Sequence, residues 1–306
     1  MTPRANALCL VAATAVALLL LATPGAAQEL EPGAYWPIPT GLNIFTVVDS
    51  LNWGDVAFDP SAPIEDASAT INTTVLSFTR AFGAGGRSAN ATVALPVVGG
   101  HLEGRYLGEP ADVGRFGLAD PRVRLAINLY GAPAMTPAAF ASYRQQAILG
   151  VSVTVALPLG QYDPAKLINI GTNRWSFRPE VGVSRTFGKW VVEAMAGVWL
   201  FTDNTDFFGG VTRSQDPIAE AQLHLTYRFT RSMWLAADGN YFTGGRTSIG
   251  GRRNIDLQRN SRVGATLSRA LGRGHAIRVS VSQGAYTTIG NDFTSIAVGY
   301  NYAWVH

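Results

Sequence analysis

The sequence predicts an all-β protein, an antiparallel transmembrane β-barrel of twelve strands forming a single domain. Hydrophobic residues make up 47% of the 306 residues, charged residues only 15%, and mean hydropathy is +0.12. After the first thirty residues, however, no apolar run approaches the roughly 18–20 residues that a membrane-spanning helix needs. The remaining chain alternates between apolar and polar residues, and its connectors alternate between short and long. This combination is typical of a barrel whose apolar face is on the outside.

Composition also excludes several classes of function. There is enough apolar surface to exclude a disordered chain. The formal net charge of +3 comes from 24 Lys and Arg against 21 Asp and Glu, and the positive charges are scattered. We therefore expect no nucleic-acid partner.

Residues 1–27 are predicted to be a cleaved signal peptide. Arg4 precedes an apolar stretch at 7–22, and Gly25 and Ala27 occupy the −3 and −1 positions of a cut before Gln28. The alternative is an uncleaved anchor helix. The only cysteine lies inside the apolar stretch, so a mature chain of 28–306 would contain no disulfide, thiolate metal site or cysteine nucleophile. Export and the barrel together predict the bacterial outer membrane.

Strict period-2 alternation marks the strands. The segment 122–130 sets Leu125 and Ile127 on one face against Arg124 and Asn128 on the other. Such alternation over eight to twelve residues predicts a strand with one apolar and one polar face. The twelve segments are 40–49, 71–80, 87–97, 121–130, 147–157, 175–187, 189–201, 218–229, 232–243, 260–269, 274–283 and 293–304. In 189–201 the facing of the apolar residues Met195, Trp199 and Phe201 stays open.

The connectors predict which end of the barrel faces out. Gaps after the second, sixth, eighth and tenth segments are only a few residues long, as periplasmic turns are. With both termini periplasmic, the external connectors are 50–70, 98–119, 158–174, 202–217, 244–259 and 284–292. The long connector 131–146 breaks the rule on the periplasmic side. There Thr136 and Pro137 form an N-cap and a first helical position, which predicts a short helix.

A soluble β-sandwich or soluble barrel is the alternative fold, because its strands alternate in the same way with the apolar face inward. Aromatic placement favours the membrane. Aromatic residues near strand ends form girdles at the two interfaces of an outer-membrane barrel. Those concerned are Trp175, Trp190, Tyr227, Phe229, Tyr241, Tyr300, Tyr302 and Trp304.

Several segments also resemble a known family. They are DPRVRLAINLYGAPAMT (120–136), TVALPLGQYDPAKLINIGTNRWSFRPE (154–180), GVWLFTDNTDFFGGVTRSQDP (197–217) and the strand start at 260–262. In this order they are similar to the MetA-pathway-of-phenol-degradation family of outer-membrane transporters, over residues 120–304. The resemblance implies an outer-membrane barrel and the passage of aromatic or other small hydrophobic compounds. It supplies no catalytic residues.

The polar faces of the strands provide the candidate functional residues. If they face the lumen, they form a structural network that stiffens the barrel, or line a wetted pathway that selects solutes, or do both. The candidates are Arg122, Arg124, Asn128, Arg178, Glu180, Glu193, Glu220, His224, Arg228, Asp238, Asn240, Arg262 and Arg278. A second, basic set lies in an external glycine-rich loop and would contact lipopolysaccharide phosphates, or be simply solvated. It comprises Arg246, Arg252, Arg253 and Arg259.

No constellation for catalysis is evident. The four histidines are far apart and lack metal-ligand spacing, so no metal or cofactor is expected. The sequence therefore predicts an outer-membrane channel for small compounds, with phenol-like molecules among them. Two alternatives stay open. One is a plugged, non-transporting barrel that acts through its surface, and the other is a barrel hydrolase built around His224.

Overall fold

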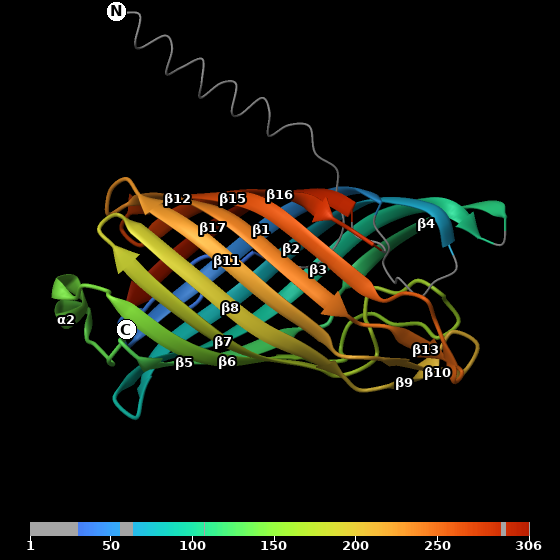
Figure 1. Ribbon diagram of the computed structural model, residues 1–306, viewed down its shortest axis with the longest axis horizontal. Helices are drawn as coiled ribbons and strands as arrows, with labels where there is room; N and C mark the ends of the chain where they lie inside the picture. Colours follow the sequence, from blue (N-terminus) through green and yellow to red (C-terminus); the bar gives the residue numbers. More distant parts are fainter. Residues whose placement is uncertain (1–29, 56–63, 107, 289–291, 306) are drawn as a thin grey trace, which may run out of the picture.

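Twelve antiparallel strands close into a barrel in the computed structural model, which describes residues 30–55, 64–106, 108–288 and 292–305 (Figure 1). The predicted signal peptide lies outside these residues. The ring consists of β1 (Leu42–Asp55), β2 (Ile64–Ala84), β3 (Arg87–Tyr106), β5 (Arg122–Tyr130), β6 (Ala147–Ala156), β7 (Ser176–Phe187), β8 (Trp190–Phe201), β11 (Ile218–Arg228), β12 (Met233–Gly244), β15 (Gln258–Gly272), β16 (His275–Tyr286) and β17 (Asp292–Val305).

The first and last strands close the ring. β1 pairs with β17 along its whole length, from Leu42 opposite Val305 to Asp55 opposite Asp292. Closure satisfies the backbone hydrogen bonds that an open sheet would leave bare in lipid. Each of the twelve segments predicted from the sequence corresponds to one strand of the ring, so the predicted fold is confirmed.

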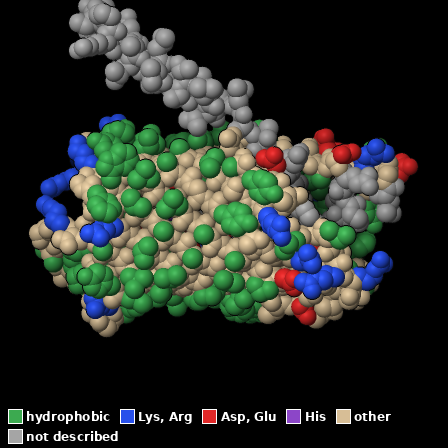
Figure 2. Space-filling view, viewed as in Figure 1, with side chains coloured by type: hydrophobic (Ala, Val, Ile, Leu, Met, Phe, Trp, Pro, Cys, Tyr) green, Lys and Arg blue, Asp and Glu red, His purple; other side chains and the backbone are tan. Residues whose placement is uncertain are grey.

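The apolar side chains point outward. On β11, Leu223 and Leu225 are 59% and 43% exposed, whereas the alternate residues His224 and Thr226 are fully buried. In Figure 2, charged side chains gather mainly toward the two ends of the barrel, and apolar side chains are spread over the wall between them. A soluble sandwich or barrel would show the opposite facing, so that alternative is wrong.

One end of the barrel, here called the turn end, carries the short turns, the helix α2 (Pro137–Ser142) and the C-terminus (Figure 1). The expected helix forms at its expected place: Thr136 is the N-cap and its hydroxyl accepts a hydrogen bond from Ala139 N at 3.3 Å. Among the described residues, no helix has the length and apolar character needed to cross a membrane.

The opposite end, the loop end, is more regular than the sequence predicts. The connector 98–119 is a β-hairpin that extends the barrel wall, in which residues 97–106 of β3 pair with β4 (Glu109–Leu118). Parts of 202–217 and 244–259 form a separate four-stranded sheet. Its strands are β9 (Asn204–Phe207), β10 (Val211–Gln215), β13 (Thr247–Ile249) and β14 (Arg252–Arg253). These strands have two to five residues, too few to show a period.

The structure also settles the facing of β8. Val192, Val198 and Leu200 are exposed on the outer wall, and the alternate residues Met195, Trp199 and Phe201 therefore face the lumen. Both faces of this strand are apolar because the lumenal one packs against another part of the chain, described next. Alternation alone cannot reveal the facing of such a strand.

Candidate functional site

Residues 30–41, which directly precede β1, lie inside the barrel. We call them the lumenal segment. Glu31 N donates a hydrogen bond to Gln222 Oε1 (3.4 Å) on β11, and Gly33 N donates one to Glu193 Oε2 (3.1 Å) on β8. Two backbone hydrogen bonds, from residue 34 to 31 and from 36 to 33, fold it into successive turns. The segment therefore crosses the lumen as a compact element held by the polar faces of the strands.

Tyr35 is the central contact of the lumenal segment and is only 3% exposed. Its hydroxyl lies 2.8 Å from Glu180 Oε1 and 2.9 Å from Ser152 Oγ. The ring lies against Gly150 and Gly182, which pair directly across β6 and β7. A Cβ atom on either glycine would come within 2.3 Å of a ring carbon. The glycine pair thus leaves a flat place on the inner wall that fits an aromatic ring.

Trp36 forms a second contact nearer the turn end. Its ring packs edge-on against Trp234 of β12, with centroids 5.5 Å apart. The guanidinium carbon of Arg228 lies 4.5 Å from the Trp36 ring centroid, and that of Arg278 lies 5.3 Å from the Trp234 centroid. Cation–π contacts of this kind gain strength where water is excluded. Two arginines therefore help to hold the tryptophan pair inside the wall.

A charge network lies along the lumenal wall beside Tyr35. Arg178 Nη1 lies 3.2 Å from Glu220 Oε1, and Arg178 Nη2 lies 3.1 Å from Glu180 Oε2 and 3.4 Å from Glu31 Oε1. Arg124 reaches Glu180 from β5 at 3.6 Å. Buried charges are stable only when they are paired. The network pairs them across neighbouring strands and includes the lumenal segment through Glu31.

His224 belongs to another buried group. Its Nδ1 lies 2.7 Å from Asp238 Oδ1, and the Thr266 hydroxyl donates a hydrogen bond to Asp238 Oδ2 at 2.7 Å. His224 Nε2 has no hydrogen-bond partner among the described residues. In a nucleophile–histidine–acid relay the hydroxyl bonds to the histidine. Here it bonds to the acid, and the group has the connectivity of a structural network.

All thirteen predicted lumen residues lie on the inner face of the ring. The structure brings Arg124, Arg178, Glu180 and Glu220 into one network, and places Arg228 and Arg278 beside the tryptophan pair. Arg262 lies apart near β17, with its guanidinium carbon 3.4 Å from the Phe293 ring centroid. The buried members are Asn128, Arg178, Glu180, Glu193, Glu220, His224, Asp238, Asn240 and Arg262; the half-buried ones are Arg122, Arg124, Arg228 and Arg278.

The predicted basic loop is folded rather than loose. Arg252 and Arg253 form β14, and Arg253 pairs with Asp216 beside β10. Arg246 lies in the bend before β13, where its carbonyl accepts a hydrogen bond from Asp216 N. Arg259 is exposed at the base of β15. The basic residues therefore stand around a sheet instead of forming one flexible patch.

Sequence reasoning missed the cavity at the loop end. It has a volume of about 180 Å³ and lies between the 157–175 connector and the four-stranded sheet. Its lining includes Tyr162, Ile170, Arg174, Phe207 and Arg213. Aromatic and guanidinium groups together make it suited to a small ring with a polar substituent.

Asp120 fixes the connector that forms this cavity. Its Oδ1 accepts a hydrogen bond from Gly160 N and its Oδ2 accepts one from Thr172 N, both at 2.9 Å. Farther along the connector, Lys166 Nζ and the backbone amide of Ala165 bind the exposed Asp163 carboxylate and lower its pKa below the usual value. Contacts to two aspartates thus fix the connector, at residues 160 and 172 near its two ends and at residues 163–166 between them.

The family model described as "Putative MetA-pathway of phenol degradation" matches residues 54–285. The chain belongs to this family. The resemblance seen over 120–304 is therefore confirmed and reaches further toward the N-terminus. A search of curated proteins finds no match.

Among solved structures, the chain resembles the COG4313 outer membrane channel from Pseudomonas putida F1, at 21% identity and a TM-score of 0.76, over 90% of this chain and 100% of that one. It also resembles the β domain of the Bordetella autotransporter BrkA, at 14% identity and a TM-score of 0.51, over 86% of this chain and 100% of that one. These likenesses support the barrel fold.

Proposed function

We propose that this protein is an outer-membrane channel for small, neutral or weakly polar compounds, aromatic molecules among them, and that the lumenal segment regulates passage. One observation carries the proposal. A line of aromatic and thioether side chains on β8 leads inward from the loop-end cavity. Arg174 of the cavity lies over Phe201 at 4.4 Å, Trp199 follows, and Met195 packs with Tyr35.

The chemistry of this line fits a ring that carries a hydrogen-bonding group. The guanidinium carbon of Arg178 lies 5.5 Å from the Trp199 ring centroid, and Trp199 Nε1 donates a hydrogen bond to Glu220 Oε2 at 3.1 Å. An apolar ring can slide along the β8 side chains while its polar group exchanges partners with Arg178 or Glu220. A charged solute would have to displace a member of the paired network, and a buried charge that is left unpaired costs free energy.

The second candidate is a plugged barrel that does not transport. The lumenal segment itself favours it, because its contacts reach from Asn128 of β5, which donates to Tyr35 O at 3.1 Å, to Gly264 of β15, beside Leu30. The hydrolase alternative has less support, since the hydroxyl nearest to the His224–Asp238 pair bonds to the acid.

The proposed location is the outer membrane, reached through the signal peptide at 1–27. The wall would then contact lipid, and exposed guanidinium groups at the loop end, those of Arg252 and Arg259, would contact lipopolysaccharide phosphates. Phosphate oxygens are strong acceptors for such groups. We propose no cofactor and no catalytic step.

Transport is tested in liposomes that contain the purified protein, with protein-free liposomes as the blank. Benzamide and benzoate form a matched solute pair, because they share a ring and differ in charge. We expect benzamide to enter faster than benzoate. Deletion of residues 30–36 should raise both rates and the conductance of planar bilayers.

Two tryptophans of β8 supply matched variants. Trp199→Ala, inside the lumen, should reduce the preference for benzamide, and Trp190→Ala, 45% exposed on the outer wall, should leave it unchanged. If wild-type liposomes admit neither solute and only the deletion variant conducts, the plugged barrel is the better description. Equal effects of the two tryptophan variants would refute the proposed path.

A further inference from the structure

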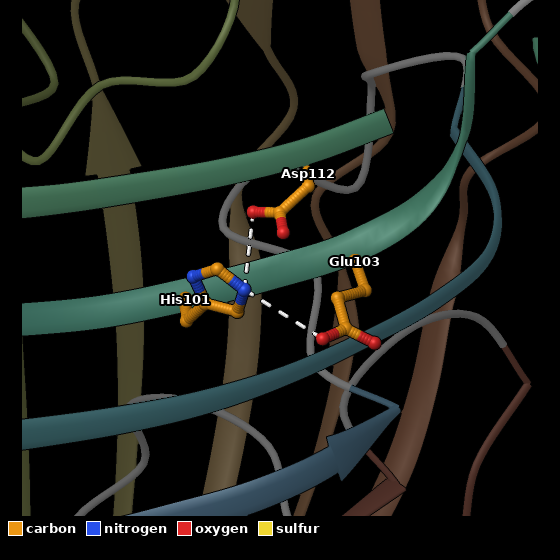
Figure 3. A group of neighbouring side chains, drawn as sticks. All are labelled: His101, Glu103 and Asp112. Atoms are coloured by element: carbon orange, nitrogen blue, oxygen red, sulfur yellow. Dashed lines mark ion pairs between the residues drawn. The ribbon is translucent and has the colours of Figure 1, made fainter. Parts of the chain in front are cut away.

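The β3–β4 hairpin carries a cluster outside the lumen that the channel proposal does not use. His101 and Glu103 project from the same face of β3, two residues apart, and Asp112 lies directly opposite Glu103 on β4 (Figure 3). His101 Nε2 is 3.0 Å from Asp112 Oδ1 and 3.6 Å from Glu103 Oε1. The three side chains thus converge on one point.

This face continues the outer wall of the barrel. Between the cluster and the turn end, Val93 and Leu95 are exposed on the same face of β3, and Phe116 of β4 is 75% exposed. The cluster therefore begins where the apolar band ends. Its side chains are about half to two-thirds exposed, so ions in the surrounding solution can reach them.

The hairpin places two carboxylates side by side. Glu103 and Asp112 are direct cross-strand partners, and like charges in such positions destabilise a sheet. Arg105, two residues farther along β3, directs Nε and Nη2 to the carbonyl of Gly108 in the hairpin turn, at 3.3 and 2.9 Å. A cation among the three side chains would relieve the repulsion between the two carboxylates.

The geometry suits a divalent metal ion. Tetrahedral Zn²⁺ with ligands at 2.0–2.2 Å has ligand–ligand separations of about 3.3–3.6 Å. The two separations from His101 Nε2, 3.0 Å to Asp112 Oδ1 and 3.6 Å to Glu103 Oε1, are close to that. The three ligand atoms all lie within 4.8 Å of one another. Opposite His101 stands Gly114, where an added Cβ would meet nothing within 4 Å. That open side leaves room for a water as fourth ligand.

We propose that His101, Glu103 and Asp112 form a binding site for one divalent transition-metal ion of the Zn²⁺ type on the outer face of the β3–β4 hairpin. An imidazole nitrogen with two carboxylates favours such ions over Ca²⁺ and Mg²⁺, which prefer sites built only from oxygen. Since the ligands project from paired strands, the sheet fixes the spacing of their backbone positions.

The test is calorimetric titration of the full, untagged barrel, folded in detergent, with Zn²⁺ and separately with Mg²⁺. We expect one Zn²⁺ per chain and no comparable Mg²⁺ binding. His101→Gln, Glu103→Gln and Asp112→Asn should each weaken Zn²⁺ binding about tenfold or more, because loss of outer-shell partners alone costs 10–100-fold. Cobalt substitution should give visible absorption bands that disappear in His101→Gln.

His275→Gln is the matched control. His275 begins β16 and bonds to Tyr300, apart from the hairpin, so this variant should bind Zn²⁺ like wild type. Heat-dependent gel mobility verifies that each barrel is folded. The substitutions at the exposed hairpin positions should leave this mobility unchanged. Absence of Zn²⁺ binding in folded wild type, or undiminished binding in folded His101→Gln, would overturn the proposal. Neither result depends on transport.

Discussion

Removal of one hydroxyl from the lumenal segment should loosen it measurably. Tyr35→Phe keeps the ring on its glycine pair and removes the contacts to Glu180 Oε1 and Ser152 Oγ. A hydrogen bond to a charged group is worth about 1.5–3 kcal/mol and a neutral one about 0.5–1.5 kcal/mol. Together they give about 2–4.5 kcal/mol, which corresponds to a roughly 30- to 1,600-fold larger undocked population at tenfold per 1.4 kcal/mol.

The assay uses the absence of cysteine from residues 28–306. Ala34→Cys places a thiol in the lumenal segment, where Ala34 packs against the buried cluster around Tyr35. Its rate of maleimide labelling reports how often the segment leaves the wall. Tyr35→Phe in this background should raise the rate by about the factor above.

Tyr241→Phe is the control, because Tyr241 lies on the outer wall and is 45% exposed. It should leave the labelling rate of Ala34→Cys unchanged. If Tyr35→Phe also labels at the unmodified rate in a folded barrel, the two hydroxyl contacts do not hold the segment and the reasoning fails.

Two further predictions concern packing and facing. Gly182→Ala would bring a Cβ within 2.3 Å of the Tyr35 ring, so it should lower the free energy of unfolding by about 1–3 kcal/mol and raise bilayer conductance. Gly239→Ala, with its nearest contact at 3.8 Å, should do neither. Equal conductances of the two variants would argue that the glycine pair does not hold Tyr35. Val153→Arg, on the outer wall of β6, should reduce the free energy of unfolding in lipid by about 2–4 kcal/mol, whereas Leu271→Arg near the turn between β15 and β16 should reduce it by about 0–1 kcal/mol. Equal costs would mean that the facing assigned to β6 is wrong.

Much of this structure is predictable from the sequence because its dominant signal is local. Period-2 alternation identifies every strand of the ring and the facing of most of them, and Thr136 with Pro137 identifies the helix. The facing of strand β8 cannot be predicted in this way, because Met195 faces the lumen although it is apolar. Its partner is Tyr35, 160 residues away in the chain, and alternation contains no information about such a partner.

The lumenal segment is the main feature that alternation does not predict. Glu31, Tyr35 and Trp36 stand in a proline-containing stretch without a period, between the predicted signal peptide and β1. The adjacent aromatic residues Tyr35 and Trp36 were the available signal. The matching glycines, Gly150 and Gly182, look like ordinary small residues of a polar strand face until their register places them together.

The route of the chain through the lumen limits the order in which this barrel can assemble. The lumenal segment continues directly into β1, and β1 completes the wall by pairing with β17, the last strand. Yet Tyr35 and Trp36 of the segment dock on β5 to β12, on strands from the middle of the sequence. Closing the wall first would oblige a bulky tyrosine and tryptophan to thread into a finished cylinder. An open sheet that receives the segment and then curls around it avoids that obstacle, so we expect the seam between β1 and β17 to close last.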